Sequence, residues 1–299
     1  MLKDCNNSLS AFNCYFILIL FKGLINTNIF ISLAAVFLTV ETQIQLGMQP
    51  QWHPYLFIRF FATLFEYNIH RFITILTNKK ALDSIKHKWV KEHIYSFYVL
   101  VFISAAGFVC VSLMAKKEVL LTLAPIAVLT LFYSTPIFKN EKNIFRFREI
   151  PYLKIVMISF VWSASTILLP IIQATGFYDS MHVMLMLMER FFFVFAITIP
   201  FDIRDMKADK YDGVKTIPLL FGERTSHFIS YGALTFFLFI SFFHYQDLRI
   251  IVALSISAIT TFIFLWSIKI RSLPYYHYGI LDGTMLLQGI LVFTFYYFK

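Results

Sequence analysis

Four aspartates lie within eleven residues of this sequence, in the segment Phe-Asp-Ile-Arg-Asp-Met-Lys-Ala-Asp-Lys-Tyr-Asp-Gly that covers residues 201–213. If a helix continues past Pro200, a rotation of about 100° per residue places all four carboxylates within about 80° of one another on one face. The bases of the segment then point elsewhere. The acids are Asp202, Asp205, Asp209 and Asp212, and the bases are Arg204, Lys207 and Lys210.

A row of carboxylates on one helix face repels itself unless water or a bound cation neutralises it. Hard divalent cations such as Mg²⁺ favour this arrangement, because they take one or two carboxylates, several waters and the phosphate oxygens of a substrate. The segment therefore indicates a magnesium site that also binds phosphate. The alternative is a solvated helix end whose acids form surface ion pairs with neighbouring lysines.

The residues that follow predict a loop of fixed shape. Gly213 can end the helix with a left-handed residue, Pro218 enforces an extended or turning chain, and Gly222 allows another turn. The loop is therefore expected to hold a constant position beside the acidic helix end.

The composition decides which elements must position these groups. Of the 299 residues, 59% are hydrophobic and 19% aromatic, and 36 Phe and 16 Tyr stand against 17 acidic residues. Such a chain cannot cover a water-exposed surface, so disorder, secretion and a cytosolic enzyme are excluded. The three cysteines, Cys5, Cys14 and Cys110, have neither metal-ligand spacing nor the even count of a disulfide framework.

The hydrophobic pattern predicts an all-α polytopic membrane protein with nine transmembrane helices. Each predicted span is about 20 residues long, as a helix that crosses about 30 Å of hydrocarbon requires. We expect one membrane-embedded domain over residues 1–299, in which residues 1–23 form an N-terminal interfacial segment rather than a cleaved signal. The predicted spans are 24–43, 54–77, 94–115, 118–138, 152–173, 181–201, 226–246, 249–270 and 276–298.

The net charge of +9 is explained by topology. With the N-terminus inside, the N-terminal segment and the alternating loops near 78–93, 139–150, 202–225 and 269–274 hold 18 basic residues, whereas the other loops hold 3. This bias predicts a cytoplasmic N-terminus and argues against a nucleic-acid partner. The expected location is a bacterial inner (cytoplasmic) membrane.

The pattern Asp-x2-Asp-x3-Asp-x2-Asp-Gly-x2-Thr-x-Pro-x3-Gly over residues 202–222 resembles the second aspartate-rich motif of UbiA-type intramembrane prenyltransferases. Shorter matches occur in the same order along the chain. They are Tyr133-Ser134 with Pro136 and Lys139, the segment Arg148-Glu-Ile-Pro151-Tyr-Leu-Lys154, the segment Val161-Trp162-Ser163, and Asp282-Gly283.

This resemblance implies a helical bundle around a central cavity, in which two aspartate motifs hold Mg²⁺ and the diphosphate of an isoprenoid. It implies transfer of the prenyl group to a lipophilic acceptor, often an aromatic ring. The metal and catalytic ligands would be Asp202, Asp205 and Asp209. The groups implied for binding the substrate are Asn68, Arg71, Tyr133, Lys139, Arg148, Lys154, Asp212 and Lys215, with Tyr133 or Trp162 sheltering the carbocation and Asn26 or Asn28 shaping the cavity floor.

The sequence departs from the family at the first aspartate motif. There the family has Asn-Asp-x2-Asp-x3-Asp, whereas this chain keeps Asn68 but places Ile69, Phe72 and Leu76 at the three aspartate positions. Apolar side chains cannot hold Mg²⁺. Two interpretations remain: nearby polar groups replace the motif and share a cavity with the second one, or they only pair within the bundle. These groups are Glu66, His70 and Thr74, which share one helix face, and Arg71.

Two functions follow from these features. The first is a Mg²⁺-dependent prenyltransferase with an altered way of holding diphosphate. The second is a non-catalytic membrane protein of the same fold that binds an isoprenoid or quinone or scaffolds other enzymes. A transporter that uses the acidic cluster is disfavoured, because the sequence has no paired discontinuous helices.

Overall fold

Helices dominate the structure, which is a computed structural model. It describes residues 8–77, 85–134, 138–140, 143–145, 152–174, 178–211 and 213–298. The strands β1 (Phe138–Asn140) and β2 (Asn143–Phe145) form an antiparallel hairpin in which Lys139 pairs with Ile144. The helices are α1 (Ser8–Asn26), α2 (Ile29–Gln45), α3 (Pro54–Thr77), α4 (Ile85–Glu92), α5 (Ile94–Ser112), α6 (Lys117–Ser134), α7 (Leu153–Gln173), α8 (Ser180–Tyr211), α9 (Ile217–Phe221), α10 (Glu223–His244), α11 (Leu248–Trp266), α12 (Ile268–Arg271), the π-helical turn η3 (Tyr276–Leu281) and α13 (Asp282–Tyr297).

The prediction of a polytopic helical membrane protein is confirmed in its main point. Among the described residues, six helices are long and apolar enough to cross a membrane, and seven if α1 and α2 together form one broken span. Each of the nine predicted stretches overlaps a helix, but a count of nine spans stays a prediction. The all-helical fold class is confirmed apart from the short β1–β2 hairpin, and only the C-terminal boundary of the predicted span 118–138 is wrong. Phe138 begins β1, two residues after Pro136, which disfavours helix for the residue before it.

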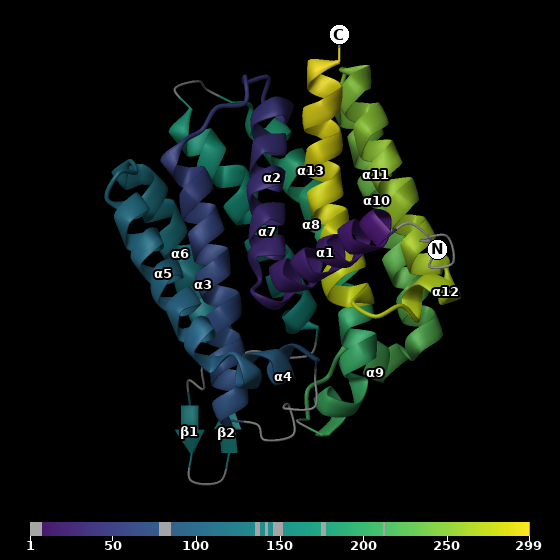
Figure 1. Cartoon of the computed structure of the whole chain (residues 1–299). Helices are drawn as coiled ribbons and strands as arrows, with labels where there is room; N and C mark the ends of the chain where they lie inside the picture. The colour runs from purple at the N-terminus through teal and green to yellow at the C-terminus, as the bar shows by residue number, and fades with distance from the viewer. Residues whose placement is uncertain are drawn as a thin grey trace.

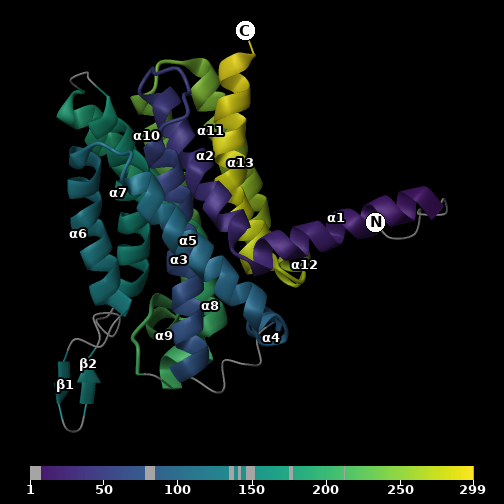
Figure 2. The same cartoon turned by 60° about the vertical axis from the view of Figure 1, so that its left-hand side comes forward.

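The chain bends by 80° between the last part of α1 and α2. Asn28, immediately before α2, has the left-handed φ of +63° that makes this bend. Figure 2 shows α1 projecting sideways from the bundle, nearly across the direction of the long helices. If α2 crosses the bilayer, α1 therefore lies close to the membrane plane.

The main hydrophobic core lies among α2, α8, α10, α11 and α13 (Figure 1). Leu38, Phe237 and Leu254 are completely buried in it. Helices α2 and α13 approach very closely at Gly289. A Cβ atom added to Gly289 would lie only 2.5 Å from the carbonyl oxygen of Phe37. Small residues permit such close packing of membrane helices.

Helix α8 continues through Pro200, as the sequence analysis expected. Proline has no N–H, so the carbonyl of Ala196 one turn earlier loses its usual donor. The hydroxyl of Ser230 on α10 donates to this carbonyl oxygen over 2.7 Å. The 32-residue helix therefore keeps its course with the help of a neighbour.

Several connecting elements gather at one end of the bundle, which is the lower end in Figure 1. There α4, β1, β2 and α9 lie near the C-terminal end of α8. These elements belong to the basic loops that the sequence analysis assigned to the cytoplasmic side. The C-terminus lies at the opposite end.

Candidate active site

Two aspartates near the end of α8 converge on one lysine of α7. The Nζ atom of Lys154 lies 2.8 Å from Asp202 Oδ1 and 3.0 Å from Asp209 Oδ2. The two acids are seven residues apart, which is about two helical turns, so the same face of α8 carries both. The exposed fractions of the side chains are 20% for Lys154, 3% for Asp202 and 13% for Asp209. The cluster is therefore largely shielded from solvent.

Asp205 has a different partner from the other two aspartates. The guanidinium of Arg204 forms two hydrogen bonds to it, of 2.7 Å from Nε and 2.9 Å from NH2. The same guanidinium lies over the rings of Phe201, at 5.2 Å, and Tyr278, at 4.9 Å. The expectation that Arg204 points away from the acids is therefore wrong. Its side chain is long enough to fold back on the next residue and to stack on aromatic faces.

The loop after α8 has the fixed shape that the sequence predicts. Gly213 has a φ of +72°, and the N–H of Val214 donates to the carbonyl of Asp209 over 2.8 Å, which closes the helix end. Gly222 also has a positive φ, of +82°. The N–H of Tyr152 donates to the carbonyl of Lys215 over 3.2 Å. The loop is thereby attached to the start of α7, the helix that carries Lys154.

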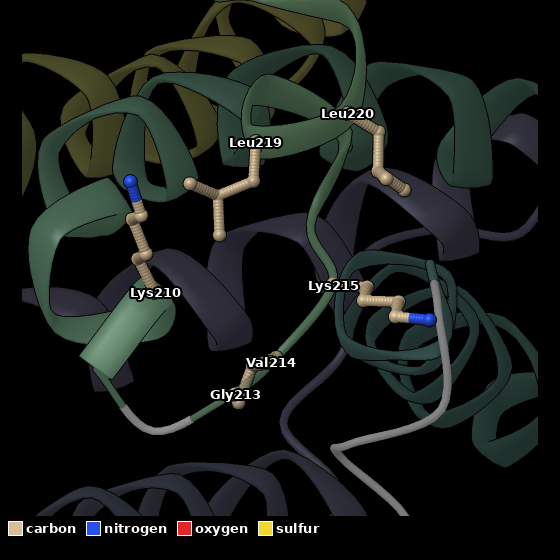
Figure 3. Close-up of a pocket in the computed structure, with 6 residues that line it drawn as sticks. All are labelled: Lys210, Gly213, Val214, Lys215, Leu219 and Leu220. Atoms are coloured by element: carbon tan, nitrogen blue, oxygen red, sulfur yellow. The ribbon is translucent and has the colours of Figure 1, made fainter.

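A cleft of about 280 Å³ lies between the end of α8 and α9. Figure 3 shows residues 213–215 crossing it, with the ammonium groups of Lys210 and Lys215 pointing in different directions. Its lining residues are Lys210, Gly213, Val214, Lys215, Leu219 and Leu220. The cleft thus combines backbone, lysine and leucine beside the acidic helix end.

The aspartate cluster has the chemistry of a cation site. The ammonium of Lys154 lies between two carboxylates, in the position that suits a cation. Among the described residues, no group of three or more His, Cys, Asp or Glu side chains is arranged to hold a metal ion. Magnesium needs only one or two carboxylates when water and phosphate supply the other oxygens. Asp202 and Asp209 therefore fit a magnesium ion that binds together with a phosphorylated ligand.

The other predicted substrate-binding residues lie in the sequence near the end of α6, before α7 and after α8. Arg148 and Asp212 lie outside the described residues. Tyr133 belongs to the last turn of α6 and Lys139 to β1, but only their backbone is described. Lys215 lies on the loop before α9 and lines the cleft. Their roles in binding stay predictions.

The end of α3 is occupied by a buried polar network. Arg71 NH2 donates to Asn28 Oδ1 over 2.6 Å, and its NH1 donates to the carbonyl of Asn26. Asn28 Nδ2 in turn donates to Asn68 Oδ1 over 3.0 Å. Asn68 Nδ2 donates to the carbonyls of Thr27 and Leu64. Asn68 and Arg71 therefore stabilise the sharp bend between α1 and α2.

Tyr278 of η3 lies between the end of α3, which carries Arg71, and the end of α8, which carries Arg204 and Asp205. Its ring receives the guanidinium of Arg204, and its hydroxyl interacts electrostatically with Asp205 and with Arg71. Phe72, which also lies near the end of α3, packs against α5 instead. Its ring contacts Phe97 and Tyr98 of α5, at centroid distances of 6.3 and 5.8 Å. One of the three replaced aspartate positions therefore belongs to the packing between α3 and α5.

Sequence reasoning missed a second charged group inside the bundle. The guanidinium of Arg59 on α3 lies over the ring of Trp162 at 4.9 Å and interacts electrostatically with Glu66. One face of Trp162 is thus already in contact with a cation. The available signal was an arginine inside an apolar stretch, which in a membrane helix marks an interior position.

The fold and this cluster define a polytopic α-helical membrane protein with a carboxylate and lysine site at one end of its bundle. The model of the UbiA prenyltransferase family matches residues 90–275, more than half of the chain. The chain therefore belongs to the UbiA prenyltransferase family. No curated protein matches its sequence.

Solved structures of UbiA homologues share the fold. A homologue from Archaeoglobus fulgidus bound to GPP and Mg²⁺ has a TM-score of 0.60 at 14% identity, covering 88% of this chain and 96% of the homologue. A UbiA homologue from the same organism bound to DMAPP and Mg²⁺ has a TM-score of 0.57 at 15% identity, with the same coverage. An apo homologue from Aeropyrum pernix K1 has a TM-score of 0.56 at 13% identity, covering 89% and 96%.

Proposed function

We propose that this protein transfers a prenyl group from an isoprenyl diphosphate to a lipophilic, often aromatic, acceptor within the membrane, with Mg²⁺ as cofactor. We place the reaction on the cytoplasmic side of a bacterial inner membrane. The observation that carries the proposal is the convergence of Asp202 and Asp209 on Lys154, next to a loop of fixed shape. Family membership and the prenyl diphosphates and Mg²⁺ bound in homologue structures support it.

Breaking an allylic C–O bond leaves negative charge on diphosphate, so the site must hold that charge in place. When bound, Mg²⁺ would supply Lewis-acid stabilisation of the departing oxygens. Asp202 and Asp209 would hold the ion, and Asp205 would be a further ligand if it leaves Arg204. Lys154, released from the carboxylates, would then contact phosphate oxygens, together with Lys215 and the predicted Lys139 and Arg148.

Diphosphate release by the detergent-solubilised protein tests this proposal. The protein is incubated with isoprenyl diphosphates of several lengths, an aromatic acceptor and Mg²⁺. We expect release that EDTA abolishes and that Asp202→Asn and Asp209→Asn each slow by at least about a hundredfold, the usual cost of removing one charge-stabilising group. Asp247→Asn is the matched control, because Asp247 pairs with Arg249 in the loop between α10 and α11.

A second function is favoured by the end of α3. There the donors of Asn68 and two nitrogens of Arg71 are engaged within the protein, and Phe72 packs on α5. A non-catalytic protein that binds an isoprenoid would have this arrangement. Binding of a prenyl diphosphate without turnover, equally tight with Mg²⁺ or EDTA, would contradict the enzymatic proposal and support this one.

A further inference from the structure

Three charged side chains are buried together inside the bundle, far from the aspartate cluster. Glu41 of α2 and Glu189 and Arg190 of α8 are each at most 1% exposed. Glu189 precedes Asp202 by 13 residues, which is about 20 Å along a helix. The group is therefore remote from the carboxylates that we propose to hold Mg²⁺. Ionisable groups at such depth are costly and require partners.

Glu41 is the carboxyl group in direct contact with Arg190. Its Oε1 atom lies 2.9 Å from Arg190 NH2 and accepts hydrogen bonds from Gln45 Nε2, at 3.1 Å, and Gln288 Nε2, at 2.8 Å. The remaining contacts of Arg190 are with neutral oxygens. They are the Leu38 carbonyl at 2.9 Å, Thr166 Oγ1 at 3.3 Å and Gln45 Oε1 at 3.3 Å.

Glu189 has fewer partners than Glu41. Its Oε1 accepts one hydrogen bond, from Gln45 Nε2 over 3.1 Å. Its Oε2 is buried, and the hydroxyl of Tyr245 is the one further polar group of the described residues that faces this carboxyl. Glu41 Oε2 accepts no hydrogen bond from the described residues, but Glu41 has the arginine beside it. An ionised Glu189 would thus bury a charge that no cation of its own offsets.

A count of the surrounding charges leaves one negative charge in excess. Glu189 interacts electrostatically with Glu41 on α2, with Arg190 on α8 and with Tyr245, which follows α10. The other packed helices contribute neutral groups to the network. These are Gln45 of α2, Thr166 of α7, Ser257 of α11 and Gln288 of α13. Two carboxylates therefore share one guanidinium.

We propose that Glu189 is a buried proton-binding site, with the proton on Oε2, and that Glu41 and Arg190 form the charged pair beside it. A line of titratable rings connects this site to the bundle end opposite the aspartates. The rings of His182 and His244 are stacked at 4.5 Å, and the rings of His244 and Tyr245 lie 4.6 Å apart. This site goes beyond the proposed prenyl transfer and does not depend on it.

Infrared spectroscopy of the solubilised protein tests the proposal directly. At about pH 8, exposed carboxyl groups are ionised, so only a buried protonated acid gives a carboxyl C=O band. We expect such a band in the wild type, shifted in D₂O, and its loss in Glu189→Gln. The matched control Glu118→Gln, which changes an exposed glutamate at the start of α6, keeps the band.

Thermal unfolding gives a second, independent readout. Glu189→Gln replaces a neutral acid by a neutral amide, so it keeps the wild-type Tm. Glu41→Gln removes the carboxylate that contacts Arg190 directly and leaves only Glu189, which forms no ion pair with Arg190 in the structure, to balance the guanidinium, so it lowers the Tm. Equal loss of Tm in both variants would show that Glu189 is ionised and would overturn the proposal.

If Glu189→Gln does not fold, ¹³C-glutamate labelling is applied to the wild type and to Glu66→Gln, which removes the other desolvated glutamate outside the Glu41–Arg190 pair. A labelled carboxyl band that persists in Glu66→Gln supports the proposal, and its loss in that variant or its absence from the wild type overturns it. A wild type without the band whose Tm rises when Na⁺ replaces a bulky organic cation also overturns it, because a bound metal cation would then supply the missing charge.

Discussion

The end of α8 and the end of α3 lie at the same side of the bundle, but their charged residues have different partners. At α8, Lys154 and two aspartates are each other's partners, and Lys154 keeps a fifth of its side chain exposed. At α3, the guanidinium of Arg71 is buried and donates to a backbone carbonyl and an asparagine. The family match begins at residue 90, so it includes the first region and not the second.

This difference separates groups that can exchange partners from groups that hold the fold. An ammonium between two carboxylates can leave when another cation arrives, because the carboxylates keep a counter-ion. A guanidinium that satisfies the end of a helix cannot leave without exposing buried acceptors. The comparison supports our proposal that the prenyl transfer is centred on α8, and it shows that the polar residues of α3 hold the bend before α2.

The largest expected effect comes from restoring a family aspartate at position 72. Because Phe72 contacts Phe97 and Tyr98, Phe72→Asp removes ring contacts and places a charge in the packing between α3 and α5. We expect a loss of about 3 kcal/mol in the free energy of unfolding, measured by denaturation in detergent, without faster diphosphate release.

Phe72→Leu is the control, because it keeps an apolar side chain and should lose about 1 kcal/mol. Faster diphosphate release in Phe72→Asp would contradict the comparison. Position 72 would then lie beside the substrate, as in the family pattern.

A somewhat smaller effect is expected for Arg71→Ala. The substitution removes the two hydrogen bonds that Arg71 donates to Asn28 Oδ1 and to the Asn26 carbonyl, which should cost about 2 kcal/mol of stability. Thermal unfolding in detergent measures it, with the exposed Arg224→Ala as the matched control. If Arg71→Ala instead unfolds like the wild type and raises KM for the prenyl diphosphate, the arginine belongs to the substrate site.

The smallest expected effect is on the free energy of unfolding and comes from Gly213→Ala at the end of α8. Gly213 has a φ of +72° and open space around its Cα, so Gly213→Ala should cost about 1 kcal/mol through backbone strain alone. Gly232→Ala in the middle of α10 also meets open space but has no such φ, so it should be neutral or stabilising. Equal unfolding free energies for the two variants would contradict the claim that the positive φ at Gly213 requires a glycine.

The sequence predicted the parts of the structure that depend on local pattern. The helix through Pro200, the turn at Gly213 and the apolar spans follow from residue type and spacing, since each is decided within a few residues. The helical spacing of Asp202 and Asp209 also placed them correctly on one face. Their partner could not be predicted, because Lys154 comes from another helix whose rotation the sequence does not specify.

The same reason explains what was missed at the other sites. Asn28, Asn68 and Arg71 come together only because the chain bends by 80°, and a bend of that kind has no clear signal before it is seen. Glu41, Glu189 and Arg190 are ordinary residues in the sequence and meet only in the packed bundle. Their presence in apolar stretches was the one local sign of an interior network.

The hydrogen bond from Ser230 to Ala196 has a consequence for the direction of the aspartates. At Pro200, helix α8 lacks one backbone hydrogen bond between its last turns and the preceding turns. The hydroxyl of Ser230 on α10 supplies the missing donor. Ser230→Ala would let the part of α8 that follows Pro200 change its angle at the proline. The direction of the Asp202 side chain thus depends on the hydroxyl of Ser230, which lies 28 residues further along the chain.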